Sequence, residues 1–140
     1  MGVVNNSGMD YKLDTLSVYT LAESFSNDIW FIVDKWTYFQ KDTVGKQLVR
    51  SADSISANIA EGYGRHFYGE SQQFYYYSRG SITETQSWLR KAKVRAMIEE
   101  ADYNRLIAET ETIHAKLNGY IKWVRSEKAK LKSPTTQSSK

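Results

Sequence analysis

Apolar residues recur at intervals of three and four in four long segments of this 140-residue chain, and this periodicity constrains the fold most strongly. The most regular segment runs from Tyr103 to Val124, where steps of three and four residues alternate as they do in a supercoiled helical seam. The single proline, Pro134, lies near the end of the chain, so no helix-breaking residue interrupts these segments. The sequence therefore predicts long, uninterrupted helices.

Polar residues before the first two segments supply candidate helix starts. Asp14 or Thr15 is expected to cap the first helix, which should end near residues 39–41. Asp42 or Thr43 is expected to cap the second helix in the same way. The predicted apolar positions of these two helices are Val18, Ala22, Phe25, Ile29, Val33 and Trp36, then Val44, Leu48, Ala52, Ile55 and Ile59.

The second segment ends at an abrupt Gly-Tyr-Gly-Arg sequence after a run of serine and alanine. Small side chains allow a neighbouring helix to approach closely, so residues 50–61 are interpreted as a packing seam. Gly62 is expected to take a positive φ angle as the residue after a helix C-cap, and Gly64 repeats that freedom two residues later.

Two further segments follow the loop at residues 63–69. The third helix is expected to reach about Val94, and the fourth to begin near Glu100. Their predicted apolar stripes are Phe74, Tyr77, Ser81, Thr85, Trp88, Leu89 and Ala92, then Tyr103, Leu106, Thr110, Ile113, Leu117, Tyr120 and Val124. Four such helices joined by short loops predict an all-α fold, an up-down-up-down antiparallel four-helix bundle.

The bundle is expected to occupy residues 12–127 as one domain, with flexible termini at 1–11 and 128–140. The last segment is basic and lacks an apolar period, which predicts a disordered C-terminal tail. The absence of cysteine excludes disulfides and zinc–thiolate sites. The N-terminus does not resemble a signal peptide and no apolar run is long enough to span a bilayer, so a cytoplasmic protein without membrane contacts is expected.

One stretch of the second and third segments resembles a known family. The resemblance rests on residues 45–52, on Ser54-Ile55 with residues 58–65, and on Phe74, residues 78–81 and Glu84. These motifs are similar to those of four-helix-bundle proteins encoded in intervening sequences of bacterial large-subunit ribosomal RNA genes, the S23 or IVP family. The resemblance covers about residues 12 to 125.

This resemblance implies a homopentameric assembly of bundles. It also implies a fold shared with the accessory variability protein of diversity-generating retroelements, which has a basic surface and binds nucleic acid and a reverse transcriptase. The expected function is therefore non-enzymatic binding of nucleic acid, RNA first, without sequence specificity. The alternative is a protein-interaction scaffold or accessory subunit that recruits a nucleic-acid enzyme such as a reverse transcriptase.

Basic residues are concentrated in the middle of the chain, where residues 43–98 carry eight Lys and Arg against four Asp and Glu. These charges could form a solvated helix end, or a positive surface that symmetry repeats around a ring and that attracts a polyanion. The candidate nucleic-acid-binding residues are Lys46, Arg50, Arg65, Arg79, Arg90, Lys91, Lys93 and Arg95.

Polar residues of the family motif have two interpretations. Glu61 and Glu84 could form a carboxylate pair for a metal or for acid–base chemistry, but ion pairing with a nearby arginine or capping of backbone donors is favoured. Ser54 and Asn58 could hydrogen-bond across a helix interface to Ser81 and Glu84, or could line a substrate site. The candidate structural residues are Ser54, Asn58, Glu61, Gly62, Ser81 and Glu84.

Aromatic residues are numerous, and not all of them fit one core. Tyr75, Tyr76 and Tyr77 are consecutive, so at least one must leave the core face of a helix. Together with Phe67, Tyr68 and Trp88 they could stack on exposed bases or form contacts between subunits, and Trp30 and Phe31 favour oligomerisation. No catalytic triad, phosphate-binding glycine loop or metal-ligand cluster is present, so no enzyme activity, metal or cofactor is expected.

Overall fold

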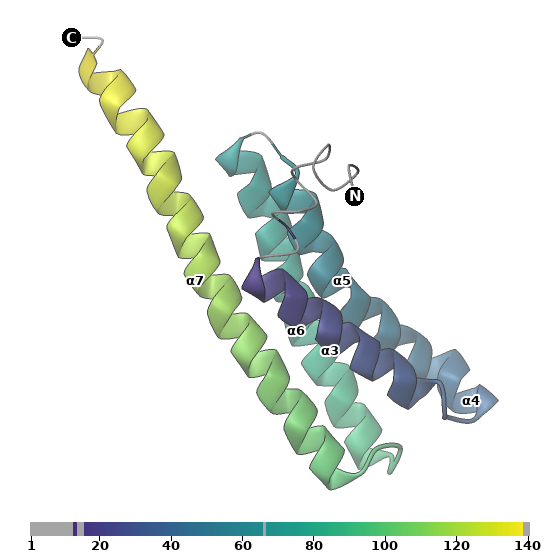
Figure 1. Cartoon of the computed structure of the whole chain (residues 1–140). Coiled ribbons are helices and arrows are strands. Elements are labelled where there is room, and N and C mark those ends of the chain that lie inside the picture. Colours follow the sequence, from purple (N-terminus) through teal and green to yellow (C-terminus); the bar gives the residue numbers. More distant parts are fainter. Residues whose placement is uncertain (1–12, 14–15, 66, 139–140) are drawn as a thin grey trace, which may run out of the picture.

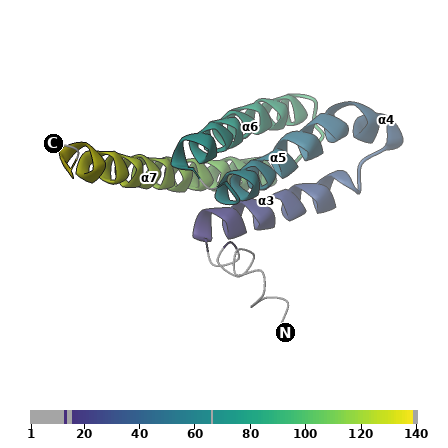
Figure 2. The same ribbon diagram turned by 90° about the horizontal axis from the view of Figure 1, so that it is seen from above.

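The apolar stripes come together in an antiparallel helical bundle in the computed structural model, which describes residues 13, 16–65 and 67–138, with side chains as far as residue 131. Its long helices are α3 (Ser17–Val33), α5 (Lys46–Tyr63), α6 (Tyr68–Val94) and α7 (Glu100–Ser138). Successive helices run in opposite directions, and α7 extends well beyond the others at its C-terminal end (Figure 1). Helices α3 and α6 each pack against both α5 and α7, which closes the bundle (Figure 2). The predicted fold class is confirmed.

The core follows the predicted stripes in three of the four helices. The expected positions of α3 and α5 are buried, with Trp36 only partly so, and the stripe of α7 holds from Leu106 onward with Ile121 added. Both Tyr103 and Tyr120 pack at the edge of this core. Because the three–four spacing places these residues on one side of each helix, burial of that side against the other helices stabilises the bundle.

Helix α6 meets the core with the predicted face only in its C-terminal half, where Thr85, Leu89 and Ala92 are buried as expected. Its buried positions are Ser71, Gln72, Tyr75, Ser78, Ile82, Thr85, Leu89 and Ala92. The expectation that Phe74, Tyr77 and Ser81 face the core was wrong, because hydroxyl side chains occupy core positions here. Ser78 Oγ donates to the Ile55 carbonyl at 2.7 Å, and Thr85 Oγ1 donates to Ser51 Oγ at 2.9 Å. These short side chains let α6 lie close to α5.

The first helix ends earlier than predicted, at Val33. A capping box at Thr37 begins the next helix: Gln40 N–H donates to Thr37 Oγ1, and Thr37 N–H donates to Gln40 Oε1. This start leads through α4 (Tyr38–Gln40) and the π-helical turn η1 (Lys41–Gly45) into α5 without a break. The predicted caps at Asp42 and Thr43 were therefore wrong, since the helix has already begun at Thr37. The N-cap of α3 is Leu16, and Asp14 and Thr15 lie outside the described residues.

Gly62 has a role other than the predicted one. It lies inside α5 rather than after it, and the C-cap Gly64 has a φ of −81°, so the positive φ angles expected at these glycines were wrong. Gly62 is needed instead for close approach. A Cβ atom there would lie 2.7 Å from Tyr75 Cε1 and 3.0 Å from the Ser71 carbonyl oxygen of α6. The packing-seam interpretation of this stretch is confirmed.

Helix α7 continues to Ser138, past the predicted end of the bundle at residue 127. Among its side chains described as far as residue 131, the last buried one is Val124, so the apolar stripe ends near the predicted boundary while the backbone remains helical. Residues 128–132 contain lysine, alanine and leucine, which have high intrinsic helix propensity. Residues 1–11 lie outside the described part of the chain.

A positive φ angle does occur at Ala96, where it is 59°. Met97 N–H donates to the Ala92 carbonyl and Ala96 N–H to the Lys93 carbonyl, the paired bonds of a Schellman motif at the end of α6. Alanine has a steric cost in this left-handed conformation that glycine avoids.

We expect Ala96→Gly to raise the free energy of unfolding by about 1 kcal/mol, measured by chemical denaturation. The matched substitution Ala57→Gly, in the exposed interior of α5, should lower it, and a loss in both variants would contradict this.

Two carboxylates meet across the interface between α3 and α5. Partial burial raises the pKa of Asp53 above its usual 3.8, and the negative charge of Glu23 adds to the rise. A raised pKa in the folded state means that ionised Asp53 costs stability at higher pH and that the cost disappears as the pH falls. We expect Asp53→Asn to raise the melting temperature at pH 7, with a gain that shrinks as the pH falls toward 3.8. A gain independent of pH in thermal melts would contradict this.

Candidate nucleic-acid interface

The eight predicted cations are spread over several faces of the bundle. Lys46 and Arg50 lie on the exposed side of α5, and Arg65 lies at the C-terminal end of that helix. Arg79 lies midway along α6 and contacts α7. The remaining four, residues 90–95, lie at the end of α6, where a rotation of about 100° per residue points them in different directions. The structure does not bring all eight together.

Two of the eight are neutralised by carboxylates on the same helical segment. Arg65 Nη2 lies 2.6 Å from Glu61 Oε2 and stacks over Phe74, with its guanidinium carbon 4.5 Å from the ring centre. Lys46 Nζ lies 3.2 Å from Asp42 Oδ1. Because each positive charge already has a partner, these two positions add little to the attraction of a polyanion.

Arginines from α6 and α7 converge on one tyrosine. Arg79 places its guanidinium carbon 5.0 Å from the centre of the Tyr76 ring and donates to Asn118 Oδ1 at 2.9 Å. Arg125 donates to the Tyr76 hydroxyl at 2.7 Å, with its guanidinium carbon 5.7 Å from the same ring. The contacts hold both guanidinium groups at the outer side of the α6–α7 pair without cancelling their charge.

A basic strip extends from this contact along both helices. A depression of about 380 Å³ is lined by Gln72, Tyr76, Arg125, Lys128 and Ala129. Arg90 is exposed and follows Arg79 by eleven residues, which is about three helical turns, so it lies on the same side of α6. We call Arg79, Arg90, Arg125 and Lys128 the α6/α7 strip. None of these four forms an ion pair with any side chain that the structure describes.

Sequence reasoning found Arg79 and Arg90 but missed Arg125 and Lys128. Arg125 belongs to a segment, residues 99–127, in which acids outnumber bases, so it did not stand out. Two of those acids lie elsewhere: Asp102 and Glu109, with Asp28 of α3, are within 3.6 Å of Arg105, on the side of α7 that faces α3. A helical-wheel count of α7 alone could have separated the two sides.

The other cations at the end of α6 contact aromatic rings of different helices. Lys93 Nζ lies 4.7 Å from the centre of the Tyr103 ring on α7, and Lys91 Nζ lies 5.9 Å from that of Trp88. Arg95 borders a separate depression with Phe39 and Met97. Lys93 therefore faces α7, whereas Lys91 contacts a ring of its own helix and Arg95 borders the second depression.

The motif residues do not form the predicted network between helices. Ser54 Oγ donates to the Arg50 carbonyl and Asn58 Nδ2 to the Ser54 carbonyl, both within α5. Likewise, Ser81 Oγ donates to the Tyr77 carbonyl within α6. Instead, the buried hydroxyl of Thr85 on α6 donates to Ser51 on α5. Ser51 lies about one turn before Ser54, and Thr85 directly follows Glu84, so these two residues face the seam in place of the predicted ones.

The two motif acids have ordinary polar partners. Glu61 pairs with Arg65, as the structural interpretation predicted. Glu84 instead accepts a hydrogen bond from Trp88 Nε1 at 3.2 Å. In the described part of the chain no three His, Asp or Glu side chains are grouped so that they could hold a metal ion.

The three consecutive tyrosines have three different environments. Tyr75 is buried against Tyr120, and burial raises the pKa of its hydroxyl well above the usual 10. Tyr76 lies half-buried in the strip, and Tyr77 is exposed, where it accepts a hydrogen bond from Gln73. The prediction that they cannot share one core is confirmed. Of the other candidates, Phe67 is exposed, and Tyr68 packs edge-on against Trp123.

Comparison with known proteins places the chain in a family context. A family model described as 23S rRNA-intervening sequence protein matches residues 14–119. A crystal structure of a protein of unknown function from the S23 ribosomal protein family of Bacteroides thetaiotaomicron superposes with a TM-score of 0.68 at 22% identity. That match covers 75% of this chain and 98% of the other, and it shows a shared fold. No curated protein matches the chain.

In the part of the chain that the structure describes, no helix is both long enough and apolar enough to cross a bilayer.

Proposed function

Because this chain belongs to the 23S rRNA-intervening sequence protein family, we propose that it is a non-enzymatic, homo-oligomeric bundle that binds nucleic acid, RNA first, through the α6/α7 strip. The observation that carries the proposal is the row of four cations on one face without a carboxylate partner among the described side chains. Such a row would bind the phosphate backbone and release counterions, without reading base sequence.

The geometry of the strip suits an extended polyanion. Arg79 and Arg90 are about 16 Å apart along the axis of α6, and Arg125 and Lys128 lie on the neighbouring helix beside Tyr76. Guanidinium groups donate to phosphate oxygens from a planar fork, which suits repeated phosphate contacts. The half-buried Tyr76 ring contacts both arginines and holds their guanidinium groups at the surface of the strip.

Exposed aromatic residues support self-association. Phe31 is 64% exposed, Tyr38 81% and Phe39 74%. Large apolar side chains that remain in water in one copy are commonly covered in an oligomer. In a closed ring, a pentamer by the resemblance described above, rotational symmetry would repeat the strip once per subunit and enlarge the positive surface. The same aromatic surface could instead hold a nucleic-acid enzyme, which is the second candidate function.

Salt dependence of RNA binding tests the proposal. A fluorescently labelled RNA of mixed sequence should bind at low salt, with an affinity that falls by a constant factor for each doubling of the salt concentration. Fluorescence anisotropy measures the affinity, and light scattering measures the mass of the protein alone and with RNA. A multimer that does not bind RNA at any salt concentration would contradict RNA binding and favour the enzyme-recruiting scaffold. A monomer would contradict self-association.

A further inference from the structure

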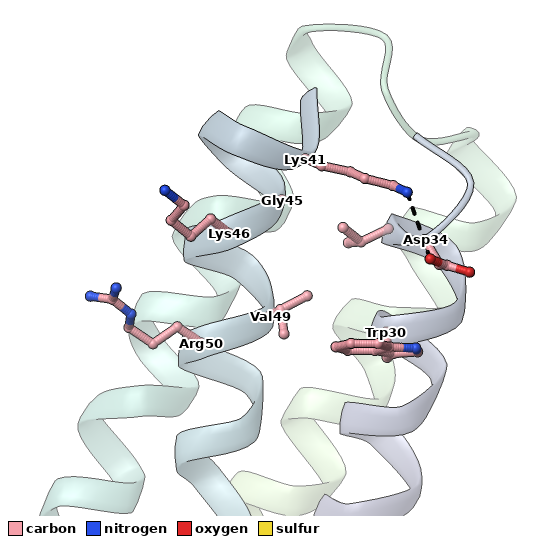
Figure 3. A pocket seen from close by; sticks show the side chains of 8 residues that line it. Trp30, Asp34, Lys41, Gly45, Lys46, Val49 and Arg50 are labelled. Carbon is pink, nitrogen blue, oxygen red and sulfur yellow. Dashed lines mark ion pairs between the residues drawn. The ribbon is translucent and has the colours of Figure 1, made fainter. Parts of the chain in front are cut away.

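A separate cavity lies on the other side of the molecule, between α3 and α5. It has a volume of about 350 Å³ and is lined by Trp30, Val33, Asp34, Lys41, Gly45, Lys46, Val49 and Arg50. Figure 3 shows Trp30 and Asp34 on α3 facing Gly45 and Val49 on α5, with Lys41 reaching across from the π-helical turn toward Asp34. We call this cavity the Trp30 slot.

The π-helical turn shapes the slot. Gly45 ends this turn, and a Cβ atom there would lie 2.8 Å from Val33 Cγ1, so the Val33 side chain packs directly on the Gly45 backbone at one end of the slot. Below that point the helices leave space that Trp30 and Val49 only partly fill, and the Trp30 side chain remains 53% exposed. Single π-helical turns are uncommon and are frequently found at functional sites.

The walls are apolar, while the charges lie at the edges. Trp30, Val33 and Val49 present carbon surface, and the Lys41–Asp34 ion pair spans the gap at 3.6 Å between Nζ and Oδ1. This ion pair is long and solvent-exposed, so it is easily exchanged for another partner. Lys41 and Lys46 are each paired with an aspartate, and Arg50 is the lining cation with no ion-pair partner among the described side chains, which favours a negatively charged ligand.

We propose that the Trp30 slot binds a small aromatic carboxylate. The ring would lie against the Trp30 indole and Val49, and the carboxylate would take over Lys41 from Asp34. A volume near the lower limit for ligand pockets suits one ring or two fused rings. Lys46 and Arg50 point away from α3 in Figure 3, so both contribute their alkyl stems, and Arg50 adds a positive field, rather than a first contact. This site is on a different face from the strip and does not depend on RNA binding.

Three indole probes of different charge test the proposal. Indole-3-acetate, 3-methylindole and tryptamine carry the same ring with a negative, zero and positive charge. Titration of the full chain, followed by two-dimensional ¹H–¹⁵N NMR, should shift the backbone amides of Gly45 and Val49 and the Trp30 indole N–H saturably. We expect indole-3-acetate to bind at least tenfold more tightly than tryptamine, with 3-methylindole between them. Absence of saturable shifts at these groups, or the reverse order, would overturn the proposal.

Variants separate the ring contact from the charge contact. Lys41→Gln should weaken indole-3-acetate about tenfold and leave 3-methylindole unchanged, whereas Asp34→Asn should strengthen indole-3-acetate because Lys41 is released. Trp30→Ala should weaken the acetate and neutral probes. Trp123→Ala, which removes another half-exposed tryptophan from α7, is the matched control and should change neither. Equal losses in the two tryptophan variants, or an unchanged affinity in Lys41→Gln, would overturn the assignment. Thermal melts establish that each variant is folded.

Discussion

Replacing Gly62 with valine is expected to lower the free energy of unfolding by about 3 kcal/mol. A Cβ atom at this position would lie 2.7 Å from Tyr75 Cε1 and 3.0 Å from the Ser71 carbonyl oxygen, and the two γ carbons of valine need still more space. Tyr75 is buried and packed against Tyr120, so it has little freedom to move away. Helices α5 and α6 would have to separate, which would also strain the Ser78–Ile55 and Thr85–Ser51 hydrogen bonds.

The same kind of change at another glycine should have the opposite sign. Gly80 lies inside α6, and a Cβ atom there would meet nothing within 4 Å. Gly80→Ala is therefore expected to raise stability by about 0.5–1 kcal/mol through helix propensity alone. Gly62→Ala should lower it despite the same gain in propensity. Chemical denaturation of the three variants and the parent protein measures these differences.

One more substitution distinguishes close approach from a positive-φ cap at Gly62. Asparagine tolerates the left-handed conformation better than alanine does, so a cap would make Gly62→Asn the milder change. If close packing against α6 requires glycine, Gly62→Asn should instead destabilise the protein more than Gly62→Ala does, because the asparagine side chain is larger. If Gly62→Asn were as stable as the parent protein, the packing role assigned here would be wrong.

Charge reversal in the α6/α7 strip is expected to cause the largest loss of function. Each lost contact between a charged donor and a phosphate costs about 1.5 kcal/mol or more, which is about tenfold in affinity. The double variant Arg79→Glu/Arg125→Glu should therefore bind RNA at least a hundredfold more weakly at low salt. Loss of two phosphate contacts should also reduce the slope of log affinity against log salt by about 1.4 for single-stranded RNA. Fluorescence anisotropy across a salt series measures both.

A variant with the same change in net charge tests whether position matters. Lys46→Glu/Arg65→Glu also replaces two cations with two acids, but at positions that are already paired with carboxylates. It should weaken RNA binding much less, through the general field alone. Equal losses in the two double variants would mean that net charge rather than the strip attracts RNA. Light scattering of both variants establishes whether the oligomer is intact.

The amount of structure that the sequence predicts differs between helices. The stripes of α3, α5 and α7 could be located because their core positions are apolar and their opposite faces are largely polar. Helix α6 has serine at core positions and aromatic rings outside the core in its N-terminal half, so counting apolar residues selected the wrong face there. Hydroxyl groups are tolerated there because each finds an acceptor on its own helix or on α5.

The candidate interface was predicted only in part for a related reason. Net charge along the chain located the basic middle segment, which contains Arg79 and Arg90. It overlooked Arg125, which belongs to a segment where acids outnumber bases but which lies in space beside Tyr76 and Lys128. The sequence indicated the Trp30 slot only through an aromatic residue beside the expected apolar stripe of the first helix. The shape of the slot depends on a π-helical turn that the spacing of apolar residues did not predict.

By itself, the sequence determined the fold class, the core faces of three helices and of the C-terminal half of α6, and the family, because regular spacing of apolar residues and a contiguous motif are local properties. The tertiary structure alone decided the core face of the N-terminal half of α6, the role of Gly62 and the grouping of cations. These depend on which side chains lie within a few ångströms across helices, as Gly62 and Tyr75 do. Packing distance and charge pairing arise between segments far apart in the chain, so only the assembled bundle reveals them.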